Sequence, residues 1–158
     1  MLFVCTGNTC RSPLAEALCK RLLADRLGCD PKQLVNRGVV VRSAGVAAFP
    51  GDAPSEQAVI VATEYGADLE AHRSRPVNPE LLTEATHVVA MTSAHAVLLS
   101  MRYTGVGPAP ELLCGTGVDL DDPIGGDLDV YRVCAETIRL HLERFLPGWL
   151  GKAEQTET

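Results

Sequence analysis

The chain has 158 residues, of which 46% are hydrophobic and 22% are charged, and its net charge is −6. This composition is typical of a globular domain with a full core, and it shows no run of membrane-spanning length, no secretory leader and no basic stripe for nucleic acid. We therefore expect a cytoplasmic protein that binds neither membrane nor nucleic acid, and whose six cysteines are catalytic, redox or core thiols.

Segments with the period of helices alternate along the chain with short apolar runs that favour strands. Such alternation predicts right-handed β-α-β units, and so a parallel sheet with helices on both faces. In sheets of this kind, ligands bind beyond the carboxyl ends of the strands. The predicted strands cover residues 2–5, 39–42, 87–91 and 111–114, and the predicted helices cover residues 12–27, 55–65, 78–85, 94–103 and 127–146.

Two helix boundaries carry clear sequence signals. Ser12 is a suitable N-cap for the first helix, and Pro13 fits the first helical position. A proline and a glycine at residues 147–148 are expected to close the last helix. We expect one domain over residues 1–150, followed by a polar and disordered tail over residues 151–158.

The loop after the first strand, within VCTGNTCRSP at residues 4–13, has the features of an anion site. A strand–loop–helix turn directs backbone N–H groups toward one point, where the helix N-terminus adds positive potential. Gly7 lets the backbone approach the anion, Asn8 tolerates left-handed geometry, and Arg11 offers a planar fork for two phosphate oxygens. No Gly-Lys-Ser/Thr follows, so the loop is not a Walker motif.

Cys5 makes this loop a candidate reaction centre. A thiol at a helix N-terminus beside Arg11 is expected to have a pKa well below the usual value of about 8.5. Its thiolate is placed for in-line attack on a bound phosphoryl group, which gives a phosphocysteine, and Ser12 can hydrogen-bond the departing sulfur. Asp122 lies in a Gly/Asp-rich loop after the fourth strand, and it is the candidate acid that protonates the leaving group and then activates water.

At these motifs the chain resembles the low-molecular-weight protein phosphatase family. The match includes VCTGNTCRSPLAEAL at residues 4–18, RSAG at residues 42–45 and DPIGG at residues 122–126. The resemblance implies a three-layer α/β sandwich with a four-stranded parallel sheet flanked by helices. It also implies an enzyme that acts on phosphorylated proteins without a metal or another cofactor.

The resemblance further implies roles for single residues. Cys5 is expected to be the nucleophile, Arg11 the phosphate clamp and Asp122 the general acid. The expected phosphate-binding set is Thr6, Gly7, Asn8, Thr9, Cys10, Arg11 and Ser12, with Ser43 supporting the shape of the loop together with Asn8 and Ser12.

Two positions bear on the substrate. Where tyrosine phosphatases of the family usually carry a bulky aliphatic residue, this chain has Thr9, and the form TGNTCRSP resembles the bacterial protein arginine phosphatases. A hydroxyl and the carboxylates near Asp122 suit a guanidinium better than an aromatic ring. Only 4% of the residues are aromatic, so few rings can line the substrate pocket, and Tyr131 is the nearest candidate. Ile124 departs from both branches, which usually have an aromatic residue after Asp-Pro. We therefore expect a phosphatase for phosphoarginine in proteins.

Three alternatives remain open at this point. The chain could be a tyrosine phosphatase of the same family, or a thioredoxin-linked arsenate reductase with Cys114 and Cys134 as candidate resolving cysteines. It could also be a non-catalytic phosphate-binding module, although that leaves Cys5 together with Asp122 unexplained. Cys10 is a candidate redox partner that would form a disulfide with Cys5 under peroxide. The four histidines show no metal-ligand spacing and are expected at surface or satisfied positions, and the oligomeric state stays open.

Overall fold

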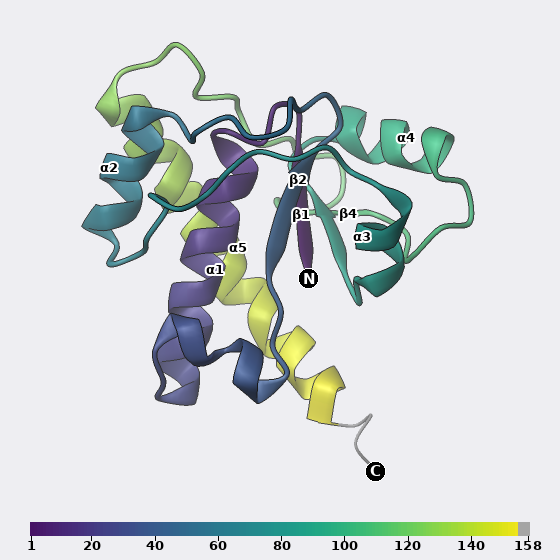
Figure 1. The fold of residues 1–158 in the computed structure, drawn as a ribbon, viewed down its shortest axis with the longest axis horizontal. Coiled ribbons are helices and arrows are strands. Elements are labelled where there is room, and N and C mark those ends of the chain that lie inside the picture. Colours follow the sequence, from purple (N-terminus) through teal and green to yellow (C-terminus); the bar gives the residue numbers. More distant parts are fainter. Residues whose placement is uncertain (155–158) are drawn as a thin grey trace.

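The computed structural model describes residues 1–154, and a parallel sheet of four strands lies at its centre (Figure 1). The strands are β1 (Leu2–Cys5), β2 (Arg42–Gly45), β3 (Val88–Ala90) and β4 (Glu111–Leu112). They are ordered β2-β1-β3-β4, so the carboxyl end of β1 lies between those of β2 and β3. The register places Cys5, the last residue of β1, beside Gly45, the last residue of β2.

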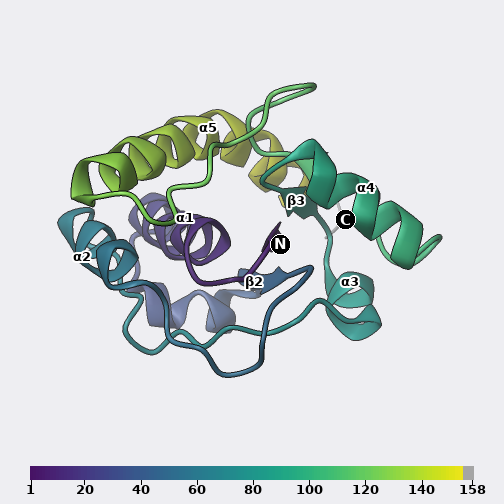
Figure 2. The same cartoon turned by 90° about the horizontal axis from the view of Figure 1, so that it is seen from above.

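Helices cover both faces of the sheet, as the alternating pattern predicts (Figures 1 and 2). The helices are α1 (Arg11–Leu27), α2 (Glu56–Glu64), α3 (Pro79–Glu84), α4 (Ser93–Arg102) and α5 (Leu128–Glu154). Side chains alternate along β1: Phe3 and Cys5 belong to the core that α1, α2 and α5 complete, and Leu2 and Val4 to the smaller core of α3 and α4. The expected three-layer α/β fold is confirmed.

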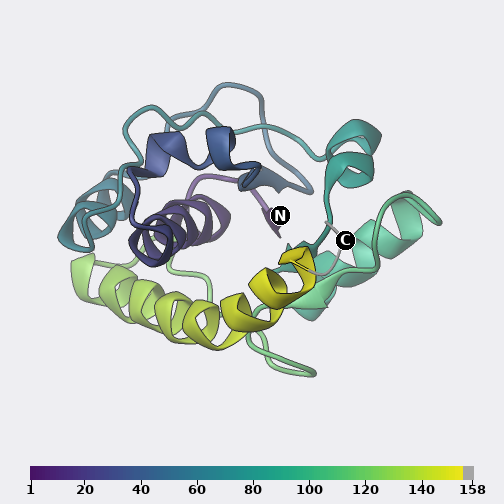
Figure 3. The ribbon, with the colours of Figure 1, turned by 90° about the horizontal axis from the view of Figure 1, so that it is seen from below.

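The larger layer is built around two long helices. Helices α1 and α5 pack along each other on one face of the sheet, with α2 beside them (Figure 3).

Within residues 1–154, no helix combines the length and the apolar character needed to cross a membrane.

The second strand begins three residues later than the sequence predicts. Residues 39–41 are valines, which favour strands, but the chain is still leaving two 3-10 turns at this point. The N–H of Val39 donates to the carbonyl of Leu34 at 3.0 Å and thereby ends these turns. β2 itself is built from the weak strand formers Arg-Ser-Ala-Gly, because pairing with β1 and burial outweigh local preference.

The last helix continues past Pro147, where the sequence predicts its end. A proline inside a helix leaves the carbonyl four residues earlier without its usual N–H partner. That carbonyl belongs to Glu143, and it accepts a hydrogen bond from the Arg26 guanidinium of α1 at 3.4 Å. Residues 151–154 are helical, which corrects the predicted tail over that stretch, and residues 155–158 lie outside the described residues.

Candidate active site

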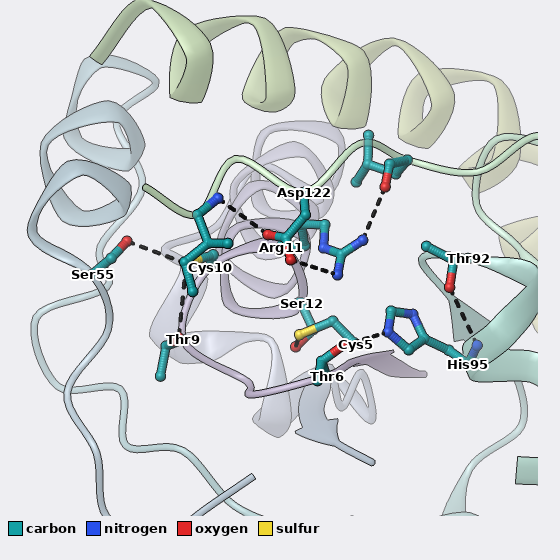
Figure 4. Close-up of polar contacts among 12 residues, drawn as sticks. Cys5, Thr6, Thr9, Cys10, Arg11, Ser12, Ser55, Thr92, His95 and Asp122 are labelled. Carbon is teal, nitrogen blue, oxygen red and sulfur yellow. Dashed lines mark hydrogen bonds and ion pairs between the residues drawn. The ribbon is translucent and has the colours of Figure 1, made fainter. Parts of the chain in front are cut away.

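The segment between β1 and α1 forms a tight loop at the carboxyl end of the central strand (Figure 4). Asn8 has a φ of 57°, and it is the only non-glycine residue with a positive φ in the described chain. The loop lies against Gly45 of β2, where a Cβ atom would be 2.3 Å from the carbonyl oxygen of Thr6. The motif RSAG therefore ends in glycine because the loop backbone occupies the place of a side chain.

Of the two roles predicted for Ser12, the N-cap is wrong, and the contact with the sulfur of Cys5 is present. Helix α1 begins one residue earlier, at Arg11, with Cys10 at the N-cap and no side-chain cap bond. The hydroxyl of Ser12 instead lies 2.9 Å from the sulfur of Cys5, as the proposed chemistry requires. It also accepts a hydrogen bond from Asn8 Nδ2 at 2.8 Å, so its own hydrogen can point to the sulfur or, over a longer distance of 3.4 Å, to the carbonyl of Ala44.

The environment of the Cys5 thiol corrects the expectation of a low pKa. Cys5 is only 3% exposed, and burial raises the pKa of its thiol because the charged form loses hydration. The Ser12 hydroxyl, the backbone N–H groups of Ser12 and Asn8, and the charge of Arg11 all lower the pKa, but together they do not outweigh burial. The neighbouring charges, which can be read from the sequence, therefore predict a lowered pKa for Cys5, whereas burial raises it.

Asn8 connects the loop to three other segments. Its Nδ2 donates to Ser12 and, at 3.0 Å, to the hydroxyl of Ser43 in β2, while its Oδ1 accepts from the backbone N–H of Arg75 at 3.0 Å. Ser43 in turn donates to the carboxylate of Glu16 in α1 at 2.6 Å. Asn8 is fully buried, so these bonds place it and Ser43 where they can hold the loop in shape.

Arg11 connects the loop to the segment after β4. Its guanidinium is nearly buried, and it donates to the carbonyl of Leu120 at 3.0 Å and to the carboxylate of Asp122 at 3.2 Å. The N–H of Leu120 is bonded to the carbonyl of Met91, directly after β3. Asp122 is thus held at the same edge of the sheet as Cys5, and its side chain is 44% exposed, so it faces both Arg11 and solvent.

The two neighbouring aspartates, Asp119 and Asp121, do not form an ion pair with Arg11 within residues 1–154. Asp119 accepts hydrogen bonds from the backbone N–H and the hydroxyl of Ser93, at 2.7 and 3.3 Å, at the start of α4. These bonds lower the pKa of Asp119. Asp121 is exposed. Of Asp119, Asp121 and Asp122, the last is the one that forms an ion pair with Arg11 within the described chain.

Cys10 contacts α5 and the start of α2. Its sulfur lies 3.2 Å from the hydroxyl of Tyr131 and 3.6 Å from that of Ser55, and Figure 4 shows it turned toward Ser55. Tyr131 is 2% exposed, so it is neither a substrate-facing wall nor a surface residue. A disulfide between Cys10 and Cys5 stays a prediction, and it requires Cys10 to leave these partners.

Three side chains of different character lie on the loop or on segments bonded to it. Thr9 is half-buried, and Ile124 is 69% exposed on the segment of Asp122. Phe49, which belongs to none of the sequence motifs, is 77% exposed. It lies on the segment between β2 and α2, whose backbone N–H groups donate to the carbonyls of Thr6 and Thr9. A single aromatic residue shortly after RSAG was its only signal in the sequence.

Two histidines contact the loop, although neither stood out in the sequence. His72 Nε2 lies 2.8 Å from the backbone oxygen of Asn8, and His95 Nε2 lies 2.8 Å from the hydroxyl of Thr6. His95 is 4% exposed, and its Nδ1 is the one buried side-chain nitrogen or oxygen of the described residues that has no hydrogen-bond partner. Both come from segments distant in sequence, so no local spacing could reveal them.

The two candidate resolving cysteines border one pocket of about 290 Å³ beside Asp122. Burial raises the pKa of both thiols, and that of Cys134 reaches about 12. A thiol is a poor nucleophile while it keeps its proton, so this setting argues against a disulfide relay through Cys114 and Cys134.

Comparison with known proteins decides the family. Residues 1–156 match the family model described as low molecular weight phosphotyrosine protein phosphatase. The chain belongs to this family. It is 39% identical to the protein-arginine-phosphatase of Geobacillus stearothermophilus over 161 aligned residues, which cover 99% of this chain and 97% of the relative.

Two solved low molecular weight phosphatases superpose on nearly the whole chain. A cysteine-to-serine mutant of the YwlE arginine phosphatase, with a phosphorylated active-site serine, gives a TM-score of 0.79 at 35% identity and covers 91% of each chain. The low molecular weight protein tyrosine phosphatase from T. tengcongensis gives 0.80 at 34% identity and covers 93% of this chain and 97% of its own. Arginine and tyrosine phosphatases thus resemble this chain equally in shape, and the substrate must be argued from the site.

Proposed function

We propose that this low molecular weight phosphatase removes phosphate from phosphoarginine residues of cytoplasmic proteins. The observation that carries the proposal is the 39% identity, over almost the full length of both chains, to a relative named as a protein-arginine-phosphatase. Thr9 supports it, because a hydroxyl in the phosphate loop suits a polar guanidinium better than an aromatic ring. The six cysteines are all free thiols, which is typical of a reducing compartment.

In the first step, the thiolate of Cys5 attacks phosphorus in line with the bond to the guanidine nitrogen. The S–P bond forms, the P–N bond breaks, and the protonated carboxyl of Asp122 gives its proton to the leaving nitrogen. Arg11 and the backbone N–H groups of the loop stabilise the phosphoryl oxygens. The thiolate arises by loss of the thiol proton to solvent, and the Ser12 hydroxyl favours this charged form.

In the second step, water attacks the phosphorus of the phosphocysteine. The carboxylate of Asp122 takes a proton from this water, the S–P bond breaks, and inorganic phosphate and the Cys5 thiolate are released. The hydroxyl of Ser12, 2.9 Å from the sulfur, stabilises the leaving thiolate. Asp122 ends the cycle protonated, as it began.

The decisive experiment compares kcat/KM on phosphoarginine and phosphotyrosine peptides of otherwise identical sequence. We expect the wild type to prefer phosphoarginine, and Thr9→Ile to shift the ratio toward phosphotyrosine by about ten- to several-hundred-fold, the scale of modest pocket changes. Thr9→Ser keeps the hydroxyl and serves as the matched control. A wild type that prefers phosphotyrosine would overturn the arginine assignment and leave the phosphatase assignment intact.

One observation favours phosphotyrosine as the second candidate substrate. Phe49 presents a large exposed ring on a segment bonded to the phosphate loop, and such a ring suits a phenyl group. If tyrosine is the substrate, Phe49→Ala should lower kcat/KM for phosphotyrosine peptides by about ten-fold. If arginine is the substrate, the same variant should change kcat/KM for phosphoarginine peptides by less than about three-fold.

A further inference from the structure

A hydrogen bond connects the first turn of α4 to the residue that follows the nucleophile. His95 Nε2 lies 2.8 Å from the Thr6 hydroxyl, and Figure 4 shows the imidazole ring facing Thr6 beside Arg11. Thr6 is exposed, whereas Cys5 before it and His95 behind it are buried. Thr6 therefore stands at the surface directly after the nucleophile, with a buried ring behind it.

The ring of His95 is neutral at neutral pH. Burial and the charge of Arg11 lower the pKa of His95 to about 4, against a smaller opposing effect of Asp122 and Asp119. A neutral imidazole carries one N–H and one bare nitrogen, so the Thr6 hydroxyl meets either a donor or an acceptor, and not both. The position of this proton decides what Thr6 can offer to a substrate.

The unpartnered nitrogen indicates which tautomer is present. If Nε2 accepted from Thr6, the proton would be on Nδ1, and a buried N–H would have no acceptor. Orphaned buried N–H groups are rarer than under-used acceptors, and Arg11, the charge with the largest effect on the ring, attracts a lone pair more than an N–H. His95 therefore carries its proton on Nε2 and donates to Thr6 Oγ1.

We propose that His95 positions the Thr6 hydroxyl as a polar wall that selects a guanidinium leaving group. With one lone pair of Oγ1 held by His95, the hydroxyl keeps its hydrogen and a second lone pair for the site. This lone pair accepts an N–H of the phosphoguanidinium, which an aryl phosphate cannot supply. Thr6 is then a second specificity residue beside Thr9, and His95 is a positioning residue. The inference rests on the proposed function, because the guanidinium belongs to that substrate.

The kinetic test uses Thr6→Val, His95→Leu and their combination. Each single variant should lower kcat/KM for a phosphoarginine peptide by about ten-fold, and for the matching phosphotyrosine peptide by less than about three-fold. The double variant should be no worse than either single one, because both remove the same contact. His95→Gln, whose amide can take the place of Nε2, should stay within about three-fold of the wild type.

The control variant is Thr92→Ala. The Thr92 hydroxyl caps α4 by accepting from the backbone N–H of His95 at 3.2 Å, and it does not contact the ring. A loss of selectivity in this variant as large as that of His95→Leu would mean that His95 acts only through the position of the helix, which would overturn the inference.

A second measurement needs no variant. Long-range ¹H–¹⁵N correlation spectra of the wild-type protein at neutral pH should show a protonated Nε2 and a bare Nδ1 for His95, and the opposite pattern would overturn the inference. Equal losses on both peptides, or losses that multiply in the double variant, would overturn it as well. A wild type that prefers phosphotyrosine would instead overturn the proposed function, so the two failures are distinguishable.

Discussion

Replacing Asn8 tests how strongly the rest of the fold depends on the phosphate loop. Its buried side chain makes three hydrogen bonds, to Ser12, to Ser43 and to the backbone N–H of Arg75. Its φ of 57° lies in the left-handed region, which asparagine tolerates and alanine does not. Asn8→Gly therefore removes the bonds alone, whereas Asn8→Ala removes the bonds and strains the backbone.

The expected magnitudes follow from these contacts. Each hydrogen bond contributes about 1 kcal/mol net, so Asn8→Gly should lower the free energy of unfolding by about 3 kcal/mol. Alanine in left-handed geometry adds about 1 kcal/mol, so Asn8→Ala should lower it by about 4 kcal/mol. With about 2–4 °C for each kcal/mol in a chain of this size, the glycine variant should lose about 6–12 °C in Tm.

Urea unfolding followed by circular dichroism measures these differences. Asn78→Ala is the matched control, because Asn78 caps α3 through one hydrogen bond, from the backbone N–H of Leu81 at 2.8 Å, and should lose only about 1 kcal/mol. If Asn8→Gly were no more destabilising than this control, the three bonds would not hold the loop. If Asn8→Ala matched Asn8→Gly, the strain part of the reasoning would fail.

Three further predictions address the chemistry. Asp122→Asn should slow turnover of phosphoarginine peptides by about 100-fold and of activated aryl phosphates much less, and equal losses in steady-state assays would leave Asp122 only a structural role. Peroxide should give a reversible Cys5–Cys10 disulfide that mass spectrometry detects. The disulfide should form faster in Tyr131→Phe, because this variant removes a hydrogen-bond partner of the Cys10 sulfur. Sulfinic or sulfonic acid alone at Cys5 would refute this prediction. The pKa of His95 is about 4 in the folded chain and 6.5 in the unfolded chain. Between these pH values the unfolded chain binds more protons, so the free energy of unfolding should fall as pH drops from 6.5 to 4. After allowance for solvent screening, we expect a fall of about 1–2 kcal/mol. Urea titrations of His95→Gln, which cannot titrate, should show a smaller fall.

Most of the fold could be predicted because the hydrophobic pattern carries it, and the two clear errors have one cause. The valines of residues 39–41 favour a strand locally, yet β2 forms three residues later, where the chain pairs with β1. Pro147 should end a helix locally, yet α5 continues there, because its packing against α1 outweighs that preference, and the Arg26 guanidinium of α1 takes the freed carbonyl. In both places a partner distant in sequence outweighs the local preference.

The site likewise combines residues that local sequence predicts with residues that only distant parts of the chain supply. Cys5, Arg11 and Ser12 lie on one short segment, so their proximity could be predicted from spacing, and the parallel strand order placed Asp122 beside them. His95 reaches the loop from α4, and Phe49 lies on a separate segment whose backbone is bonded to the loop, so only the folded chain shows them. The predicted low pKa of Cys5 is wrong for the same reason, because burial comes from the whole fold and cannot be read from neighbouring charges.

The contacts of Cys5 also suggest a division of labour within the loop. The backbone N–H groups and Arg11 favour negative charge on the sulfur, but these groups would also bind the phosphoryl oxygens, so a bound phosphate competes with the thiolate for them. Arg11 is shared further with Leu120 and Asp122. The Ser12 hydroxyl lies 2.9 Å from the sulfur and is held there by the side-chain amide of Asn8, which is also bonded to Ser43 and to the backbone of Arg75. We therefore expect Ser12 to keep stabilising the thiolate when phosphate occupies the loop, and Asn8 to support this by fixing Ser12 in position.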